Sequence, residues 1–184
     1  ALSNRKNKRR IKTLLVGLDN AGKTTMLYRM MDYSVDDQLS FVENGIEFVT
    51  YNNLDIFTWD LGGSTKYGHR WREHYKTTDA LIYVLDSTDT DRINEVFEEL
   101  KKICCDLKPF VPVLIMLNKL DINSGSSSPS SSISVELINV YMSSILATWQ
   151  FHCQPSVATR GEGIQEGLAW LDRALIELDS RKEA

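Results

Sequence analysis

A glycine-bearing octapeptide near the start of the chain has the residue types and spacing of a phosphate-binding loop. Residues 17–24 read Gly-Leu-Asp-Asn-Ala-Gly-Lys-Thr, which matches the pattern G-x-x-x-x-G-K-[ST]. Glycines let the backbone approach a phosphate closely, and N–H groups at the start of a helix attract an anion. We therefore expect Lys23 to neutralise the β- and γ-phosphates of a nucleoside triphosphate. The Thr24 hydroxyl is expected to bind Mg²⁺, with Thr25 near the α-phosphate.

A second candidate metal ligand lies in the tetrapeptide Asp60-Leu61-Gly62-Gly63. An aspartate at the carboxyl end of a strand, across from the phosphate loop, can hold a water of bound Mg²⁺. The N–H of Gly63 is then placed to reach the γ-phosphate. The order of this segment after Lys23 favours that function over an ordinary turn.

The tetrapeptide Asn118-Lys119-Leu120-Asp121 carries residues that can select a base. Guanine presents two neighbouring donors, N1–H and the 2-amino group, and one carboxylate can accept from both, whereas adenine lacks this pair. We expect Asp121 to bind these donors, Lys119 to lie along the base plane, and Asn118 to tie this loop to the phosphate loop. In a site built for that edge, the wrong base leaves buried groups unpaired, which discriminates strongly.

A fourth segment, 156–159, reads Ser-Val-Ala-Thr after a short predicted strand. Its position suits a backbone N–H, that of Ala158, directed at the guanine O6. All four segments follow strands at their carboxyl ends, where open α/β sheets bind ligands. The candidate nucleotide-contacting residues are Gly17, Asp19, Asn20, Ala21, Gly22, Lys23, Thr24, Thr25, Asp60, Gly63, Asn118, Lys119, Asp121, Ala158 and Thr159.

Apolar runs predict the strands that position these segments. The near-continuous runs at 12–16, 80–86 and 111–118 are typical of parallel strands buried on both faces. The β-rich runs at 45–51 and 54–60 are separated by two asparagines, which predicts a hairpin.

Helical periodicity alternates with these strands. It is expected at 24–31, at 93–104 and at 164–178, where the leucine stripe predicts core packing. Strands alternating with helices imply a mostly parallel α/β sheet with right-handed crossovers. The Ser-rich segment 124–134 interrupts this pattern, and we expect a mobile insertion loop because it offers little apolar surface to bury.

Composition sets the class of protein and its expected domains. The chain has 184 residues, 42% hydrophobic and 25% charged, which fits one globular domain. We expect a basic segment at 1–12, a nucleotide-binding domain at 13–179 that includes the insertion, and a tail at 180–184. The net charge of −4 argues against nucleic-acid binding by the whole molecule.

The basic segment and the cysteines bear on location. The first twelve residues contain no acid, and their basic residues are Arg5, Lys6, Lys8, Arg9, Arg10 and Lys12. Such a run is either a solvated lead-in or a contact with anionic lipid head groups. The three cysteines lack zinc-finger spacing and predict reduced thiols. With no apolar membrane span and no secretory signal, a cytoplasmic protein is expected, with peripheral contact to an intracellular membrane as the further expectation.

The set of motifs resembles the Ras-like small GTPases, and specifically their ADP-ribosylation-factor-like (Arf-like) branch. The residues that carry the resemblance are 17–25, 59–63, Trp71-Arg72, 84–87, 118–121, and 158–163 leading into 167–171. The resemblance implies a P-loop NTPase fold with a mostly parallel six-stranded sheet flanked by helices, and one antiparallel hairpin between two switch segments. It also implies a monomeric GTP/GDP switch with Mg²⁺, an exchange factor, a GTPase-activating protein, effectors and a role in membrane traffic. The hairpin at 45–60 is expected to shift register between nucleotide states.

Two positions depart from the family pattern. The family places Gln directly after its Asp-x-Gly-Gly motif, where it orients the attacking water, and this chain has Ser64 there. Serine is too short for that role, so with Lys23 and Ser64 as the candidate catalytic residues we expect slow hydrolysis unless a partner supplies the missing group. Counting back from Trp59 without gaps places Phe41 at the switch I threonine that binds Mg²⁺, with Ser40 adjacent as a substitute if the loop is shifted by one residue.

Three functions are compatible with these residues. The leading hypothesis is a regulated GTPase switch. The first alternative is a non-hydrolysing scaffold that keeps GTP or GDP as a structural cofactor, which Ser64 and Phe41 motivate. The second is a P-loop kinase, which shares the Gly-Lys-Thr loop but does not need the Asn-Lys-x-Asp segment.

Overall fold

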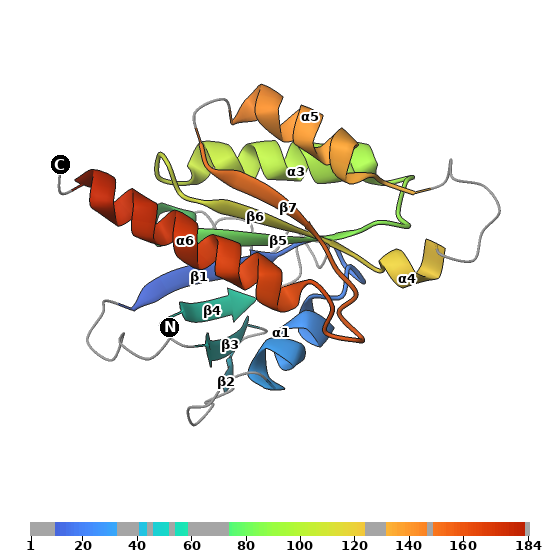
Figure 1. The fold of residues 1–184 in the computed structure, drawn as a ribbon, viewed down its shortest axis with the longest axis horizontal. Coiled ribbons are helices and arrows are strands. Elements are labelled where there is room, and N and C mark those ends of the chain that lie inside the picture. Colours follow the sequence, from blue (N-terminus) through green and yellow to red (C-terminus); the bar gives the residue numbers. More distant parts are fainter. Residues whose placement is uncertain are drawn as a thin grey trace.

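The computed structural model of the chain is an α/β sheet covered by helices on both faces (Figure 1). It describes residues 10–32, 41–43, 46–51, 54–58, 74–123, 132–146 and 149–182.

In this described part of the chain the sheet has seven strands, in the order β2-β3-β4-β1-β5-β6-β7. They are β1 (Ile11–Val16), β2 (Phe41–Glu43), β3 (Ile46–Tyr51), β4 (Leu54–Thr58), β5 (Ala80–Asp86), β6 (Val113–Asn118) and β7 (Phe151–Pro155). Strands β4, β1, β5, β6 and β7 are parallel neighbours, whereas β3 is antiparallel to both β4 and β2. The sheet is therefore mostly parallel, as predicted.

The six predicted strands are present, and β2 is an addition to them. Tyr51 of β3 pairs with Leu54 of β4, which confirms the hairpin with its two-residue connection. Strand β2 extends the same sheet by three residues and pairs with β3, with Phe41 opposite Phe48. Three residues carry too little hydrophobic pattern for sequence analysis to find such a strand.

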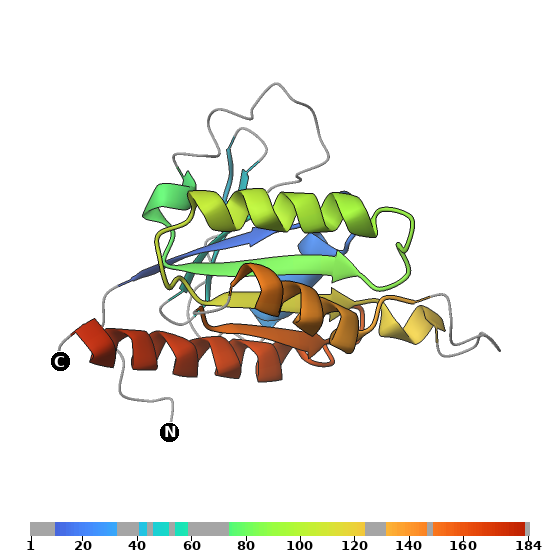
Figure 2. The same cartoon turned by 90° about the horizontal axis from the view of Figure 1, so that it is seen from above.

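Two of the described helices pack on each face of the sheet, and a short fifth helix, α4, follows β6. They are α1 (Lys23–Asp32), α3 (Ile93–Asp106), the short α4 (Leu120–Asn123), α5 (Val135–Ile145) and α6 (Ile164–Lys182). Buried side chains of α3 and α5 belong to one hydrophobic cluster, and those of α1 and α6 to another. Figure 2 shows α3 and α5 side by side over the sheet.

The central strands contribute to both clusters, which explains their unbroken apolar runs. Tyr83 and Leu85 of β5 are buried on the α3 side, while Ile82 and Val84 are buried on the α6 side. Successive strand residues point to opposite faces, so a strand covered on both sides must be apolar throughout. Each fully buried Leu, Ile or Val stabilises the fold by about 1.5–3 kcal/mol relative to an exposed one. In α6 the leucine stripe packs into the core as predicted, with Leu171 fully buried.

The last residues of the predicted insertion 124–134 pack against the domain and lead into α5. Ile133 is 3% exposed within the core, and its N–H donates to Ser87 O at 2.9 Å. Ser134 is the N-cap of α5, because its Oγ accepts from the Leu137 N–H at 3.2 Å. One apolar side chain and one capping hydroxyl are enough to anchor this end of the segment. Residues 124–131 lie outside the described ranges.

Regular elements cross both predicted ends of the nucleotide-binding domain. Strand β1 begins at Ile11, before residue 13, and α6 continues to Lys182, past residue 179. In the described ranges, no helix has the length and apolar character needed to cross a membrane. The three cysteines are free thiols, as predicted, and burial raises the pKa of Cys104 and Cys153 to about 12.

Candidate nucleotide-binding site

The glycine-bearing loop 17–22 joins β1 to α1 and lies against the sheet. Gly17 has φ +155°, and a Cβ there would lie 2.2 Å from Val84 O in the neighbouring strand. Gly22 has φ +98°, and a Cβ there would lie 2.4 Å from Asn118 Nδ2. Asn20 is also left-handed, with φ +60°. The loop conformation therefore needs glycine at 17 and 22, both for space and for backbone geometry.

Lys23 turns back over the loop from the first position of α1. Its side chain is 4% exposed, and Nζ donates to Gly17 O at 3.1 Å and Leu18 O at 2.8 Å. The first four N–H groups of a helix have no partner within the helix, so the start of α1 offers hydrogen-bond donors beside this ammonium. The exposed Thr24 and Thr25 are in the same first turn. A helix N-terminus and a cation beside a glycine-bearing loop fit a polyphosphate.

Asn118, the last residue of β6, connects two loops through one buried side chain. It is 2% exposed; Nδ2 donates to Ala21 O at 2.9 Å, and Oδ1 accepts from the Ala158 N–H at 2.9 Å. The expected tie between this segment and the phosphate loop is present. The Ala158 N–H is hydrogen-bonded to Asn118 in this structure, so its contact with guanine O6 stays a prediction that requires this bond to be shared or exchanged.

Lys119 is held by Asp86, the last residue of the neighbouring strand β5. Lys119 has φ +65°, and its Nζ donates to Asp86 Oδ2 at 2.6 Å. The Thr88 N–H and hydroxyl donate to Asp86 Oδ1 at 2.9 and 2.7 Å. Burial opposes ionisation of Asp86, but these hydrogen bonds outweigh it, so the pKa of Asp86 lies below its ordinary value. Asp121, the proposed base reader, is half-buried in α4, two residues after Lys119.

The segment at 156–159 is fixed to the same edge of the sheet. Ser156 is 2% exposed, and its N–H donates to Leu117 O at 2.8 Å. Arg29 of α1 reaches this loop, with Nη2 donating to Thr159 O at 2.6 Å. The structure thus brings together the predicted residues of the first, third and fourth segments. Asp86 belongs to the segment 84–87 that carries the family resemblance, but the sequence did not indicate its contact with Lys119, and Arg29 had no sequence signal beyond its polarity.

The remaining predicted site residues lie outside the described ranges. These are Asp60, Gly63 and Ser64, together with the switch I substitute Ser40. Phe41 is described only through its backbone, as the first residue of β2. Among the described residues, no group of three or more His, Cys, Asp and Glu side chains could hold a metal ion.

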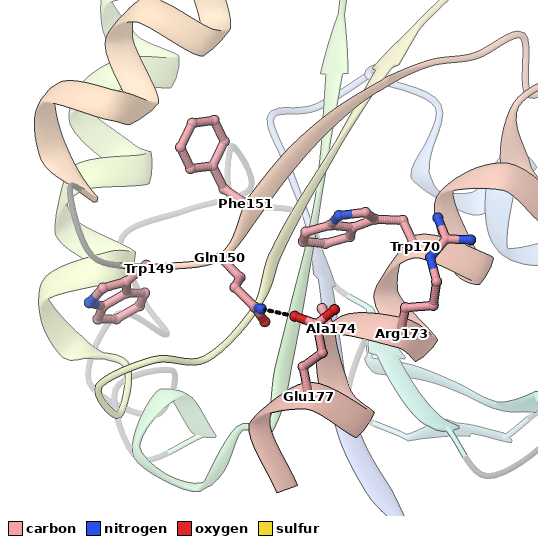
Figure 3. A pocket seen from close by; sticks show the side chains of 7 residues that line it. All are labelled: Trp149, Gln150, Phe151, Trp170, Arg173, Ala174 and Glu177. Atoms are coloured by element: carbon pink, nitrogen blue, oxygen red, sulfur yellow. Dashed lines mark hydrogen bonds between the residues drawn. The ribbon is translucent and has the colours of Figure 1, made fainter. Parts of the chain in front are cut away.

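A hollow of about 230 Å³ lies elsewhere, between the start of β7 and the side of α6 (Figure 3). Its lining residues are Trp149, Gln150, Phe151, Trp170, Arg173, Ala174 and Glu177. Gln150 Nε2 donates to Glu177 Oε2 across it at 2.6 Å. Because β7 runs parallel to β6, its start lies at the opposite end of the sheet from Asn118. This hollow contains none of the candidate nucleotide-contacting residues.

Comparison with known proteins places the chain in a family. The profile of the ADP-ribosylation factor family matches residues 1–175. ADP-ribosylation factor 3 of Arabidopsis thaliana is 39% identical over 164 residues, covering 88% of this chain and 86% of that protein.

Two solved structures share the fold. The Arl6 (BBS3) small GTPase of Trypanosoma brucei, with bound GppNp, aligns with TM-score 0.69 and 25% identity, covering 91% of this chain and 98% of that one. The ADP-ribosylation factor-like GTP-binding protein SAR1 of Encephalitozoon cuniculi, in complex with GDP, aligns with TM-score 0.71 and 19% identity, covering 96% and 84%. The chain therefore belongs to the ADP-ribosylation factor family and is an Arf-like small GTPase.

Proposed function

We propose that this chain is a guanine-nucleotide switch that alternates between GDP and GTP to control effector binding in membrane traffic, with slow intrinsic hydrolysis. The observation that carries the proposal is the convergence of Lys23, Asn118 and the Ala158 loop at one edge of the sheet. Two related structures carry a GTP analogue and GDP, which supports the same ligand class here.

The phosphate end of the site follows from the loop and the first turn of α1. The amides of residues 17–25 cradle the phosphates, and the Lys23 ammonium offsets charge that develops on the transferred phosphoryl group. Mg²⁺, when bound, neutralises phosphate charge; Thr24 and Asp60 are the residues we expect to hold it. The exposed Thr24 side chain in the first helical turn fits this role.

The base end of the site rests on the loop after β6. Asp121 accepts from guanine N1–H and the 2-amino group, and Lys119, oriented by Asp86, lies along the base. Ala158 and Thr159 close the O6 side. The hydrogen bonds of Asn118 keep the base end and the phosphate end at a fixed separation.

Base selection is tested with Asp121→Asn. Replacing the carboxylate with an amide removes the double acceptor for guanine, so GTP affinity should fall by about 100-fold or more while xanthosine triphosphate gains. Competition titrations with GTP, ATP and xanthosine triphosphate measure this, and Glu166→Gln on the exposed side of α6 is the matched control. An unchanged preference for GTP in Asp121→Asn would contradict the proposed base contact.

Slow hydrolysis is tested at Ser64. Because a serine hydroxyl is too short to orient the attacking water, Ser64→Gln should raise single-turnover GTP cleavage by about 10-fold or more. The matched control is Ser144→Gln, which makes the same change on the exposed side of α5. Equal or faster cleavage by the native chain would overturn the assignment of Ser64.

The alternative is a GTP/GDP-binding scaffold that does not hydrolyse. Its support is the inclusion of Phe41, the ungapped equivalent of the switch I threonine, in β2. Limited proteolysis with GDP and with GppNp separates the two functions, because a switch changes its cleavage pattern with nucleotide and a scaffold does not.

Peripheral membrane contact is the further part of the proposal. Arg5, Lys6, Lys8 and Arg9 favour anionic head groups by roughly 1 kcal/mol each near the surface, whereas Arg10 is paired with Asp55 and Lys12 lies in β1. Sedimentation with anionic and neutral vesicles at two salt concentrations tests this contact.

A further inference from the structure

Arg92, the residue directly before α3, holds the side chain of Asp19 in the phosphate loop. Its Nη1 donates to Asp19 Oδ1 at 2.6 Å, and its Nη2 to the main-chain Asp19 O at 3.3 Å. Its Nε donates to Asp89 Oδ2 at 2.6 Å. One guanidinium therefore lies between two carboxylates and also contacts the backbone of the loop.

The position of Arg92 is not explained by the helix that it precedes. Arg92 is the N-cap of α3, yet its side chain makes no capping hydrogen bond. The side chain is 34% exposed and belongs to neither hydrophobic cluster. Its polar contacts are instead with Asp19 in the phosphate loop and with Asp89 in the connection between β5 and α3.

Asp19 brings a negative charge into a loop that must accept a polyanion. The hydrogen bond from Arg92 is the main reason that the pKa of Asp19 lies below its ordinary value, and the charge of Lys23 acts in the same direction. Asp19 is therefore ionised at neutral pH. A bare carboxylate in this loop would repel phosphate, and it would repel a triphosphate more than a diphosphate because the triphosphate carries more charge.

We propose that Arg92 is a specificity-determining residue that neutralises Asp19, so that the phosphate loop accepts a nucleoside triphosphate as well as a diphosphate. The inference rests on the nucleotide binding proposed above and adds a residue outside the loop to that site. Asp89 holds the guanidinium from the other side.

A purely mechanical tether makes a different prediction from charge neutralisation. If Arg92 only fastened the loop, Arg92→Ala would weaken both nucleotides equally, whereas Asp19→Asn, which keeps both the main-chain and a side-chain acceptor oxygen, would change neither affinity. If Arg92 neutralises charge, removing it exposes Asp19, whereas removing Asp19 relieves repulsion. The two single substitutions then change GppNp affinity in opposite directions, and in the double substitution these changes cancel.

The experiment measures affinities of the full chain for GDP and GppNp, by competition titration with excess Mg²⁺. The variants are Arg92→Ala, Asp19→Asn and the double substitution. Lys102→Ala is the matched control, since it also removes one positive charge from an ion pair, that of Lys102 with Glu99 at 3.1 Å within α3. Thermal unfolding of each variant without nucleotide reports on its fold.

Charge neutralisation predicts an asymmetric pattern. Arg92→Ala should weaken GppNp about 10-fold and GDP about 3-fold, and Asp19→Asn should tighten GppNp about 2- to 3-fold. The double substitution should return to within about twofold of the native chain, and raised salt should shrink the loss in Arg92→Ala. Lys102→Ala should match the native chain.

Three results would overturn the inference: equal losses for the two nucleotides in Arg92→Ala, weaker GppNp binding by Asp19→Asn, or a double substitution no better than Arg92→Ala. Failure of the proposed function gives a different result, because the native chain would then bind neither nucleotide.

Discussion

Asn118 joins two loops of the candidate nucleotide site through one buried side chain. Its amide spans the gap between the phosphate loop, at Ala21 O, and the loop after β7, at the Ala158 N–H. Both partner residues are nearly fully buried, at 2% and 3% exposed. A buried backbone group that loses its partner costs more than the hydrogen bond itself contributed.

Asn118→Ala should therefore lower the free energy of unfolding by about 2–4 kcal/mol, because it leaves two buried backbone groups unpaired. Urea unfolding of the nucleotide-free chain measures the loss. Gln150→Ala is the control, since it removes an amide hydrogen bond to Glu177 at an exposed site and should cost under about 0.5 kcal/mol. Similar losses in the two variants would show that Asn118 has no special structural role.

At the scale of elements, the site is built where strands end. Asp86 closes β5 and Asn118 closes β6, and the two residues are paired in register. Consequently Lys119, the next residue, reaches Asp86 across the strand ends at 2.6 Å. The positive φ of Lys119 redirects the chain at this point, so the ion pair and the turn support each other.

Asp86→Asn should destabilise the chain by about 1–2 kcal/mol at pH 7, because Lys119 loses a charge-assisted hydrogen bond. The effect should depend on pH in one direction. The folded pKa of Asp86 is lowered, so its contribution is fully present above the unfolded value of about 3.9 and is lost as pH falls through the folded value.

Urea unfolding of both proteins from pH 7 down to about pH 3 measures this difference. It should be constant in the neutral range and shrink in acid. A difference that persists unchanged at the acid end would show that Asp86 acts by packing.

The central elements were predictable because their physical signals are local. The runs at 80–86 and 93–104 match β5 and α3 closely. A strand buried on both faces is apolar throughout, and a helix buried along one side has apolar residues at helical spacing. Contacts across long separations were not predictable. Arg92 and Asp19 are 73 positions apart, and nothing in the residues around either one signals the pair. The capping role of Ser134 was hidden because it is the last of many serines in the segment 124–134.

The candidate site was predictable for a related reason. Chemistry that needs an ammonium, close amides and a carboxylate at set spacings leaves a recognisable motif, as at 17–24 and 118–121. The motifs do not show which hydrogen-bond partner each group has in the folded chain. The Lys23 ammonium donates to carbonyl oxygens of its own loop, and the Ala158 N–H donates to Asn118.

At the scale of the whole molecule, the sheet separates two cores, and elements that belong to each lie at the candidate nucleotide site. The loop 17–22 precedes α1 in the cluster that includes α6, while Arg92 precedes α3 in the other cluster. A ligand bound at this edge contacts elements that anchor both cores. Its binding energy therefore adds to the stability of the entire chain.

Guanine nucleotide at 100 times its dissociation constant should raise the free energy of unfolding by about 2.7 kcal/mol. For a chain of this length that corresponds to a rise in Tm of roughly 5–10 °C. Thermal unfolding with GDP, with GppNp and with ATP at equal concentration measures it. ATP should leave Tm nearly unchanged, and an equal rise with ATP would contradict guanine selection.

The link that Asn118 makes between the two loops predicts how fragments of a nucleotide bind. Asn118 links the phosphate end and the base end of the proposed site. An intact nucleotide would bind both ends at once, so that its second contact forms at high effective concentration. Guanosine and pyrophosphate supplied separately each lose their own translational and rotational freedom on binding. Their combined occupancy should stay far below that of GDP, although together they present nearly the same atoms.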